Sequence, residues 1–481
     1  MLYRRLLLPA WLAGLAALLF AIDEAHGLPA VWLANRNACI GVFFGLLALI
    51  AHDRWRRDGW RPGAFLAPFA LLVGLLAGEI ALAAGGYLFA YALFLDTGTR
   101  RSRLASLVPG GLVGMVWWIA YRAMGYGASG SGVYIDPGSS PIEFTGALVE
   151  RLPILLFGQW VFPSGLYQML SQQAGRILWL VAATALALIA GLLLPILKRN
   201  RVARFFALGM ILSLIPAAAT FPDDRLLFFA GFGGMGLLAQ FLAAVWDRDD
   251  WVPSSRLRRL PMMVAFWAFA AIHLVFAPLG LATTANRVRT FGTIIDRAAS
   301  SLPSDSGIDD QIAVIVNTPT VFISFYGPLV QALQGRPIPS RTLILGSGIY
   351  PTTISRPARD VLAIRPLGGY LPLPGSPRPG REASQPAFHP AYFFQMLDHL
   401  YRDATPMRTG DRIGYGGATV EIADVTEDGR PSEVRVHFNV DLEDSSLRWL
   451  QWKGGVYVPF APPEVGDTVV LPAVTIPEGA P

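Results

Sequence analysis

Long apolar runs recur through the first 281 residues of this 481-residue chain, and they limit its fold more than any other feature. A helix needs about 20 apolar residues to cross a bilayer. With 53% apolar and 15% charged residues, the composition is typical of a membrane protein rather than a soluble globule. The runs predict nine membrane-spanning helices: Leu6–Ile22, Ala38–Ala51, Ala64–Leu76, Ala81–Leu95, Leu104–Ala120, Ile177–Leu197, Phe205–Ala219, Leu226–Trp246 and Pro261–Leu281.

A break in the apolar region 63–95 and an uneven distribution of basic residues between the loops support the count of nine spans. The apolar region from 63 to 95 is divided at Gly78–Glu79, because a carboxylate midway through one span is costly. The Arg and Lys residues of the loops then gather on one side, which indicates the cytoplasmic side. Arg4 and Arg5 precede the first run without a small-x-small cleavage site after it, so the first helix is expected to be retained. The N-terminus is therefore expected in the cytoplasm and residues beyond 284 outside it.

Several classes of partner and cofactor are disfavoured. A net charge of +5 does not indicate nucleic acid, because much of the excess lies in short loops between apolar runs. Cys39 is the only cysteine, which excludes an intrachain disulfide and a thiol metal site. The histidines His389, His399 and His437 lack the spacing of zinc ligands, and no metal site is predicted there.

The loop from 125 to 173 is the longest between the expected spans, and it contains the amphipathic stretch Ile142–Val161. Such a stretch is typical of a helix lying along the membrane surface. The alternative is a segment that packs on the domain after the last span. The residue pattern leaves both interpretations open.

The composition changes after residue 284, where Pro, Asp, Glu and Arg become more frequent. Residues 285–375 are predicted to form a small α/β unit, and residues 376–481 an antiparallel sandwich or barrel. Trp449 and Trp452 could form a sugar-stacking platform, but paired aromatics in a strand are more often core. The expected elements are helices Ala285–Ser301, Val321–Gln334 and Ala391–Arg402, strands Gln311–Asn317, Arg341–Leu345, Ala418–Ile422, Glu433–Asn439, Arg448–Trp452, Val456–Pro459 and Thr468–Leu471, and a linker at Pro366–Ala387.

Ionisable groups are concentrated where the first apolar helix ends and the next begins, in the stretch Leu19–Asn37 (LFAIDEAHGLPAVWLANRN). Charged groups beside a bilayer are costly unless they face a polar cavity or each other, which makes this stretch a candidate site. The alternative is a loop that caps two helix ends. The candidate residues are Asp23, Glu24, His26, Trp32, Asn35, Arg36 and Asn37.

A second polar cluster, Asp223, Asp224 and Arg225, comes just before a later apolar helix. Acidic side chains favour the amino end of a helix, so the cluster is either a helix cap with a local ion pair or part of a site. In the second interpretation, Arg225 binds the phosphate of an outward-facing lipid carrier.

Three blocks resemble the GT-C superfamily of membrane glycosyltransferases, and most closely the transmembrane-and-TPR O-mannosyltransferase group and related bacterial proteins. The blocks are LFAIDEAHGLPAVWLANRN, AGEIALAAGGYLFAYALFLD (Ala77–Asp96) and DDRLLFFAGFGG (Asp223–Gly234). In the first block, His26, Trp32 and Arg36 match the second His, the Trp and the following Arg of a His-Pro-x-His-x-Glu-Ala-Val-x-Trp-like stretch. Glu79 matches the Glu of a Lys-Glu pair, and Arg225 the Arg of a Glu-Arg pair. The likeness covers roughly residues 6–250.

This resemblance implies an inverting transfer of a sugar from a polyprenyl-phosphate donor at the outer face of the membrane. It also implies an acidic residue in the first outward loop, acting as a base or as a ligand for a divalent cation. Asp23 and Glu24 stand where the family has His-Pro. The family has further spans upstream that carry its catalytic acid, so this chain is expected to begin several helices into the family pattern. Three explanations stay open: the start is truncated, Asp23 and Glu24 have become the acidic pair, or the protein has lost catalysis. The tail shows no 34-residue helical repeat.

We therefore expect a GT-C-like glycosyltransferase, or a catalytically degenerate relative, in a bacterial inner membrane. Asp23 or Glu24 would deprotonate the acceptor, His26 would orient the acid, and Arg36 and Arg225 would neutralise the leaving phosphate. Trp32, Asn35, Asn37, Glu79, Asp223 and Asp224 are expected to contact substrate. The expected partners are membrane lipid and a polyprenyl-phosphate-linked sugar, without nucleic acid. The alternative is a non-catalytic assembly or export component whose outer domain binds a glycan or a protein.

Overall fold

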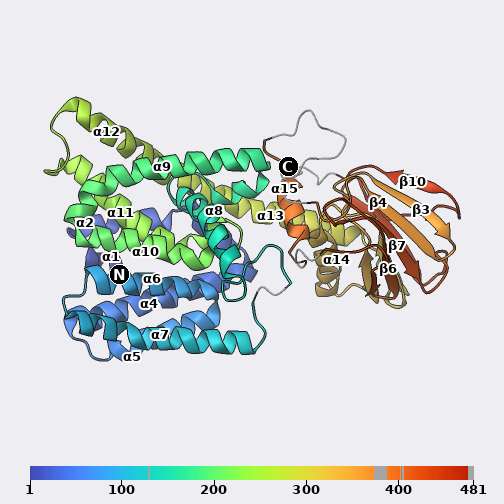
Figure 1. Ribbon diagram of the computed structural model, residues 1–481, viewed down its shortest axis with the longest axis horizontal. Coiled ribbons are helices and arrows are strands. Elements are labelled where there is room, and N and C mark those ends of the chain that lie inside the picture. Colours follow the sequence, from blue (N-terminus) through green and yellow to red (C-terminus); the bar gives the residue numbers. More distant parts are fainter. Residues whose placement is uncertain (128–129, 373–386, 390, 401, 403–405, 475–481) are drawn as a thin grey trace. The chain divides into compact units, whose positions relative to one another are not determined.

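The computed structural model describes residues 1–481 apart from 128–129, 373–386, 390, 401, 403–405 and 475–481. The chain divides into two compact units, coloured from blue to yellow and from yellow to red in Figure 1. The first unit comprises Met1–Ser129, Tyr134–Tyr167 and Ala174–Val288, and the second comprises Gly130–Val133, Gln168–Gln173 and Arg289–Pro481.

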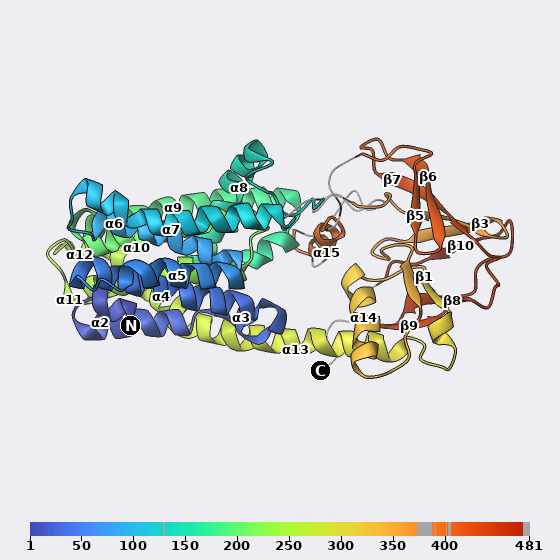
Figure 2. The same cartoon turned by 90° about the horizontal axis from the view of Figure 1, so that it is seen from below.

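The regular secondary structure of the first unit is all helical. A helix satisfies the backbone N–H and C=O groups of an apolar run by hydrogen bonds within the run itself. Its helices are α1 (Leu2–Leu6), α2 (Ala10–Ala21), α3 (Gly27–Val31), α4 (Arg36–Asp58), α5 (Gly63–Ala77), α6 (Ala83–Phe94), α7 (Arg100–Ala123), α8 (Pro141–Trp160), α9 (Gln172–Arg199), α10 (Arg201–Ala217), α11 (Phe228–Asp247), α12 (Arg256–Ala271) and α13 (Ala277–Ser301). Helix α4 packs on α5, and α5 packs on α7 (Figure 2). Helix α11 packs on both α2 and α10.

Within the described residues, five helices are long and apolar enough to cross a membrane, or six if the bent pair Ala10–Ala21 and Glu24–Val31 is one span. These apolar helices identify a membrane protein. They are fewer than the nine full-length spans expected. Helix α5 has 15 residues and α6 has 12, each shorter than a bilayer requires by itself. Helix α11 lies at the centre of the first unit, since 94% of its apolar 18-residue stretch is buried. The corresponding share for α7 is 6%.

The break expected at Gly78–Glu79 is confirmed, because α5 ends at Ala77 and a 3-10 turn, η3 (Glu79–Leu82), precedes α6. The expected span Pro261–Leu281 and the expected helix Ala285–Ser301 belong to one continuous helical stretch. There the chain stays helical through a π-helical turn, η6 (Ile272–Phe276), and then through α13. The stretch 142–161 is the helix α8, and the side chains of Ile154, Leu155 and Trp160 are buried within the first unit.

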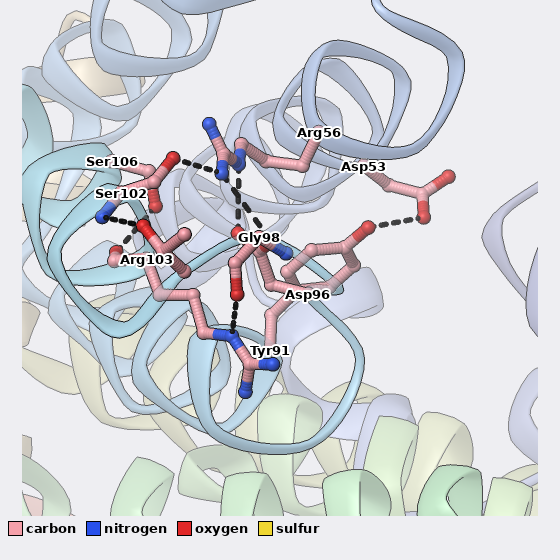
Figure 3. Close-up of polar contacts among 9 residues, drawn as sticks. Asp53, Arg56, Tyr91, Asp96, Gly98, Ser102, Arg103 and Ser106 are labelled. Carbon is pink, nitrogen blue, oxygen red and sulfur yellow. Dashed lines mark hydrogen bonds and ion pairs between the residues drawn. The ribbon is translucent and has the colours of Figure 1, made fainter.

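Ion pairs join four helices at one end of the first unit (Figure 3). Arg56 donates to Asp96 from Nε (2.7 Å) and to the Ser102 hydroxyl from Nη2 (2.8 Å). On the other side, Asp53 is buried, accepts a hydrogen bond of 2.9 Å from Tyr91 and is paired with Arg5. The network therefore fixes α1, α4, α6 and the start of α7 relative to one another.

The described part of the second unit contains two sheets, the end of α13 from Arg289 onward, and the helices α14 (Val321–Leu333) and α15 (Ala391–Asp398). The four-stranded sheet has the order β2-β1-β8-β9, in which β1 pairs in parallel with β2 and β8. The six-stranded sheet has the order β10-β3-β4-β7-β6-β5 and is antiparallel. The strands are β1 (Ile312–Ile315), β2 (Arg341–Ile344), β3 (Thr352–Ala358), β4 (Val361–Pro366), β5 (Arg412–Tyr415), β6 (Ala418–Val425), β7 (Pro431–Phe438), β8 (Leu447–Lys453), β9 (Val456–Pro459) and β10 (Thr468–Leu471).

This topology corrects the boundary expected at residues 375/376. Strand β8 continues the sheet of β1 and β2, and strands β3 and β4 belong to the sheet of β6 and β7, so strands from both expected units share each sheet. The expected strand positions at β9 and β10 are confirmed, whereas β3, β4 and β5 were not expected. Most of the linker expected at 366–387 lies outside the described residues. Trp449 and Trp452 are buried, which confirms that they are core residues.

Candidate functional site

The candidate site begins with Asp23, which follows α2 directly. Its Oδ1 accepts a hydrogen bond of 3.1 Å from the Ala25 amide and so caps the 3-10 turn η1 (Glu24–His26). Turn η1 packs on a second 3-10 turn, η5 (Asp224–Leu226), which precedes α11. The two polar clusters of the sequence, about 200 residues apart along the chain, therefore meet in one place.

Asp23 is buried, and its second oxygen has a partner from another element. Gln159, near the end of α8, donates a hydrogen bond of 2.9 Å from Nε2 to Asp23 Oδ2. The His26 ring stacks on Phe228 with centroids 4.3 Å apart, and the Phe20 ring meets its edge at 4.4 Å. Both contacts position the imidazole beside the carboxylate.

A second imidazole, His273 of the π-helical turn, is also buried and interacts electrostatically with Asp23. Within the described part of the chain, three buried atoms of this cluster have no hydrogen-bond partner: His26 Nε2, Gln159 Oε1 and His273 Nε2. A buried polar atom without a partner costs about 1–3 kcal/mol. Three of them around one carboxylate indicate a site rather than packing alone.

Asp223, Asp224 and Arg225 form the other wall. Asp223 Oδ1 accepts a hydrogen bond of 3.0 Å from the Arg225 amide, and the Arg225 Nε lies 3.7 Å from the same oxygen. The cluster therefore forms a cap with a local ion pair, and this arrangement is compatible with a role in a site. Asp224 is held by Ser164, whose backbone amide and hydroxyl donate to its Oδ1 at 2.6 and 2.8 Å.

Burial and the neighbouring charge of Asp223 raise the pKa of Asp224 to about 6, although the two hydrogen bonds from Ser164 act in the opposite direction. A carboxylate with a pKa close to the working pH is suited to accept a proton from a reacting group. Asp224 is half-buried, which leaves it more accessible than Asp23. Asp224 is therefore a candidate general base.

The remaining residues of the stretch 19–37 take different places. Glu24 lies against Gly280 of α13 rather than beside Asp23. Trp32 ends α3 and is half-buried. Asn35 precedes α4, and its Nδ2 is buried with no partner in the described structure.

Arg36, Asn37 and Glu79 form a separate group at the start of α4. All three are exposed. The Asn37 side chain lies beside Gly78, and Glu79 accepts a hydrogen bond from the Tyr121 hydroxyl. Among the described hydrogen bonds and ion pairs, none joins this group to Asp23 or Asp224. The expectation that Arg36 and Arg225 act on one phosphate thus has no contact to support it.

The described residues contain no set of three His, Cys, Asp or Glu side chains placed to hold a metal ion. A divalent cation at this site would therefore need ligands from elsewhere. The chemistry available from the described side chains is proton transfer and hydrogen bonding by carboxylates, imidazoles and an amide.

Gln159, Ser164 and His273 were not identified from the sequence. His273 did carry a signal, since an ionisable residue inside the apolar run 261–281 is costly and functional by default. Gln159 and Ser164 carried none, because a single amide or hydroxyl near a helix end is common. Comparison with known proteins matches this chain to no family model, no curated protein and no solved structure.

Proposed function

We propose that this protein is a membrane glycosyltransferase of the GT-C type, which transfers a sugar from a polyprenyl-phosphate donor to a hydroxyl acceptor at the outer face of a bacterial inner membrane. The observation that carries the proposal is the meeting of η1 and η5, which brings Asp23 and His26 next to Asp223, Asp224 and Arg225. These residues belong to two of the three blocks that resemble that superfamily.

In this proposal Asp224 takes the proton of the acceptor hydroxyl as its oxygen attacks the anomeric carbon. The bond from that carbon to the phosphate oxygen breaks, and polyprenyl phosphate leaves with the electron pair. Arg225, which is mostly buried and lies over the Phe221 ring, is placed to neutralise the phosphate. Asp23 and His26 then support the site from beneath.

The distribution of charge supports the proposed orientation. Arg5 precedes α2 and pairs with Asp53, a residue of the network in Figure 3, whereas Asp23 follows α2. The basic network and the acidic site therefore lie at opposite ends of that helix. By the positive-inside rule, the network belongs to the cytoplasmic side and the site to the outer side. Reporter fusions after Gly59 and Gly138 would test this, with a cytoplasmic signal expected from the first only.

The decisive experiment measures loss of labelled sugar from a polyprenyl-phosphate-linked donor in proteoliposomes, with bacterial envelope extract as the source of acceptor. Asp224→Asn should lower the rate at least a hundredfold, and Asp23→Asn should lower it less. Glu143→Gln, an exposed carboxylate at the start of α8, is the matched control and should act like wild type. Transfer that is equal in all four proteins would refute the proposal. An absence of transfer in every protein would favour the non-catalytic assembly or export component.

A further inference from the structure

Three buried polar atoms around Asp23 lack a partner among the described residues, and they belong to three different elements. His26 Nε2 is in η1, Gln159 Oε1 in α8 and His273 Nε2 in η6. The side chains of all three residues are more than nine-tenths buried. Because native proteins pair nearly all buried polar groups, such a cluster indicates a partner that binds from outside the chain.

Gly231 of α11 faces this cluster, and the lack of a side chain there leaves the polar atoms uncovered on that side. A Cβ built on Gly231 would lie 3.3 Å from Gln159 Oε1, 3.5 Å from Asp23 Oδ2 and 3.6 Å from His26 Nε2. Polar atoms of three side chains therefore converge on the side of Gly231 where any other residue would carry its Cβ. Any residue other than glycine would fill the position with its own side chain.

The chemistry of the lining selects the kind of atom. Gln159 Oε1 accepts hydrogen bonds only, as does an ionised Asp23, while each imidazole can donate or accept. A phosphate oxygen would face two acceptors and the carboxylate charge, which disfavours it. The described residues hold no metal-ligand set. A neutral hydroxyl group, which both donates and accepts, satisfies the lining.

The backbone around His273 gives an independent indication. A π-helical turn interrupts the helix between α12 and α13 at this residue, and such turns occur frequently at functional sites. Aromatic rings lie against both imidazoles: His26 stacks on Phe228 with centroids 4.3 Å apart, and the His273 and Phe269 centroids are 6.3 Å apart. The Nε2 of each imidazole remains without a partner among the described residues. The two rings are thus positioned before any ligand arrives.

We propose that Gly231, Gln159, His26 and His273 form a binding site for one hydroxyl group of a neutral sugar, next to Asp23. That the hydroxyl belongs to a sugar rests on the proposed function; the site itself rests on the unpaired atoms and on the convergence of polar atoms at Gly231. In this proposal His273 is a substrate-binding residue contributed by the π-helical turn.

The test uses the full-length protein in lipid nanodiscs and follows the shift of its thermal midpoint with a panel of methyl glycosides. Gly231→Ala places a methyl group 3.3 Å from Gln159 Oε1 without altering any polar group, and alanine is the better helix former. Gly191→Ala is the matched control, since a Cβ at Gly191 of α9 meets nothing within 4 Å. We expect at least one glycoside to stabilise wild type and Gly191→Ala, and to bind at least tenfold more weakly to Gly231→Ala.

His273→Phe is the second variant and serves if Gly231→Ala fails to fold; it should weaken glycoside binding to a similar degree, and His273→Gln should restore part of it. Inorganic phosphate is the comparison ligand, and Gly231→Ala should leave its effect unchanged. The proposal is overturned if no glycoside stabilises wild type, or if all variants bind glycoside equally. If Gly231→Ala loses glycoside binding and wild type transfers no sugar, the site is retained and the transferase is refuted. If wild type transfers sugar and Gly231→Ala binds glycoside as wild type does, the transferase is retained and the site is refuted.

Discussion

The side-chain amide of Gln159 donates a hydrogen bond of 2.9 Å to the carboxylate of Asp23, across 136 residues of sequence. Hydrogen bonds to charged groups contribute about 1.5–3 kcal/mol. Gln159→Leu keeps the volume of the side chain but leaves Asp23 Oδ2 without this donor. We therefore expect a loss of about 2 kcal/mol in the free energy of unfolding, measured by denaturation in detergent.

A double-mutant cycle separates this bond from general disruption. Asp23→Asn removes the charge, so Gln159→Leu should cost at least 1 kcal/mol less in that background than in wild type. Gln173→Leu, on an exposed position of α9, should change stability by less than about 0.5 kcal/mol. Additive effects of the two substitutions at Asp23 and Gln159 would show that the bond contributes no coupling.

Asp224 predicts a pH dependence with a definite sign. Its pKa is about 6 in the folded protein, above the ordinary value of 3.8. The folded state therefore binds the proton more tightly than the unfolded state, and the stabilisation from Asp224 is complete below about pH 4 and is lost as the pH rises through 6. Because asparagine does not titrate, the stability of Asp224→Asn relative to wild type should increase between pH 4 and pH 7.

The measurement is the difference between the thermal midpoints of wild type and Asp224→Asn at each pH, since other carboxylates titrate in both proteins alike. Asp223 and Arg225 are the charged neighbours on the same turn, and both remain in the variant. If transfer is observed, its rate in wild type should also rise with an apparent pKa near 6. A difference in midpoint that is constant from pH 4 to pH 7 would contradict the assignment.

Arg5 and its neighbour Arg4 form a natural pair of test and control in α1. Arg5 pairs with Asp53, whose side chain is 1% exposed, whereas Arg4 is exposed. Arg5→Met leaves a buried carboxylate without its cation, and breaking a buried pair costs about 3–5 kcal/mol. Because Arg5 is 27% exposed and the Tyr91 hydrogen bond remains, we expect about 2 kcal/mol, a value below that range.

Arg4→Met should change the free energy of unfolding by less than about 0.5 kcal/mol. Adding Asp53→Asn to Arg5→Met should recover part of the loss, because the remaining group is then neutral. Equal destabilisation by the substitutions at Arg4 and Arg5 would show that the ion pair of Arg5 with Asp53 does not stabilise this end of the helices.

The sequence allowed good prediction wherever structure depends on local pattern. The split at Gly78, the helix over 142–161 and the strands β9 and β10 follow from breaks, periodicity and turn glycines that are visible within a short window. The pairing of β1 with β8 is not local: it joins Ile312 to Leu447 across most of the second unit, and no pattern near either strand reports it. Strand β3 was missed because its residues TTISRPA contain a proline and no alternation of apolar residues.

The candidate site shows the same limit. Charge density identified Asp23, His26 and the Asp223–Arg225 cluster, because ionisable groups stand out among apolar residues. It also selected Arg36 and Glu79, which the folded chain places in a separate exposed group. Their position next to the other candidates in the sequence did not show on which side of α4 these residues would lie. Gln159 and His273 reach Asp23 only through the packing of α8 and the π-helical turn.

Trp449 distinguishes a core role from a sugar-binding role in the second unit. It is buried, packs against Phe438 with ring centroids 5.3 Å apart, and donates a hydrogen bond of 2.8 Å from Nε1 to the Leu442 carbonyl. Trp449→Ala should lower the free energy of unfolding of this unit by about 3–5 kcal/mol, through the cavity and the unpaired carbonyl. Phe325→Ala, on a residue of α14 that is 67% exposed, should have little effect.

Limited proteolysis of the full-length protein along a denaturant series measures the effects of both substitutions. A stacking platform would give the opposite pattern, in which Trp449→Ala leaves stability unchanged and weakens glycan binding, since a ring that contacts ligand leaves no cavity in the core when it is removed.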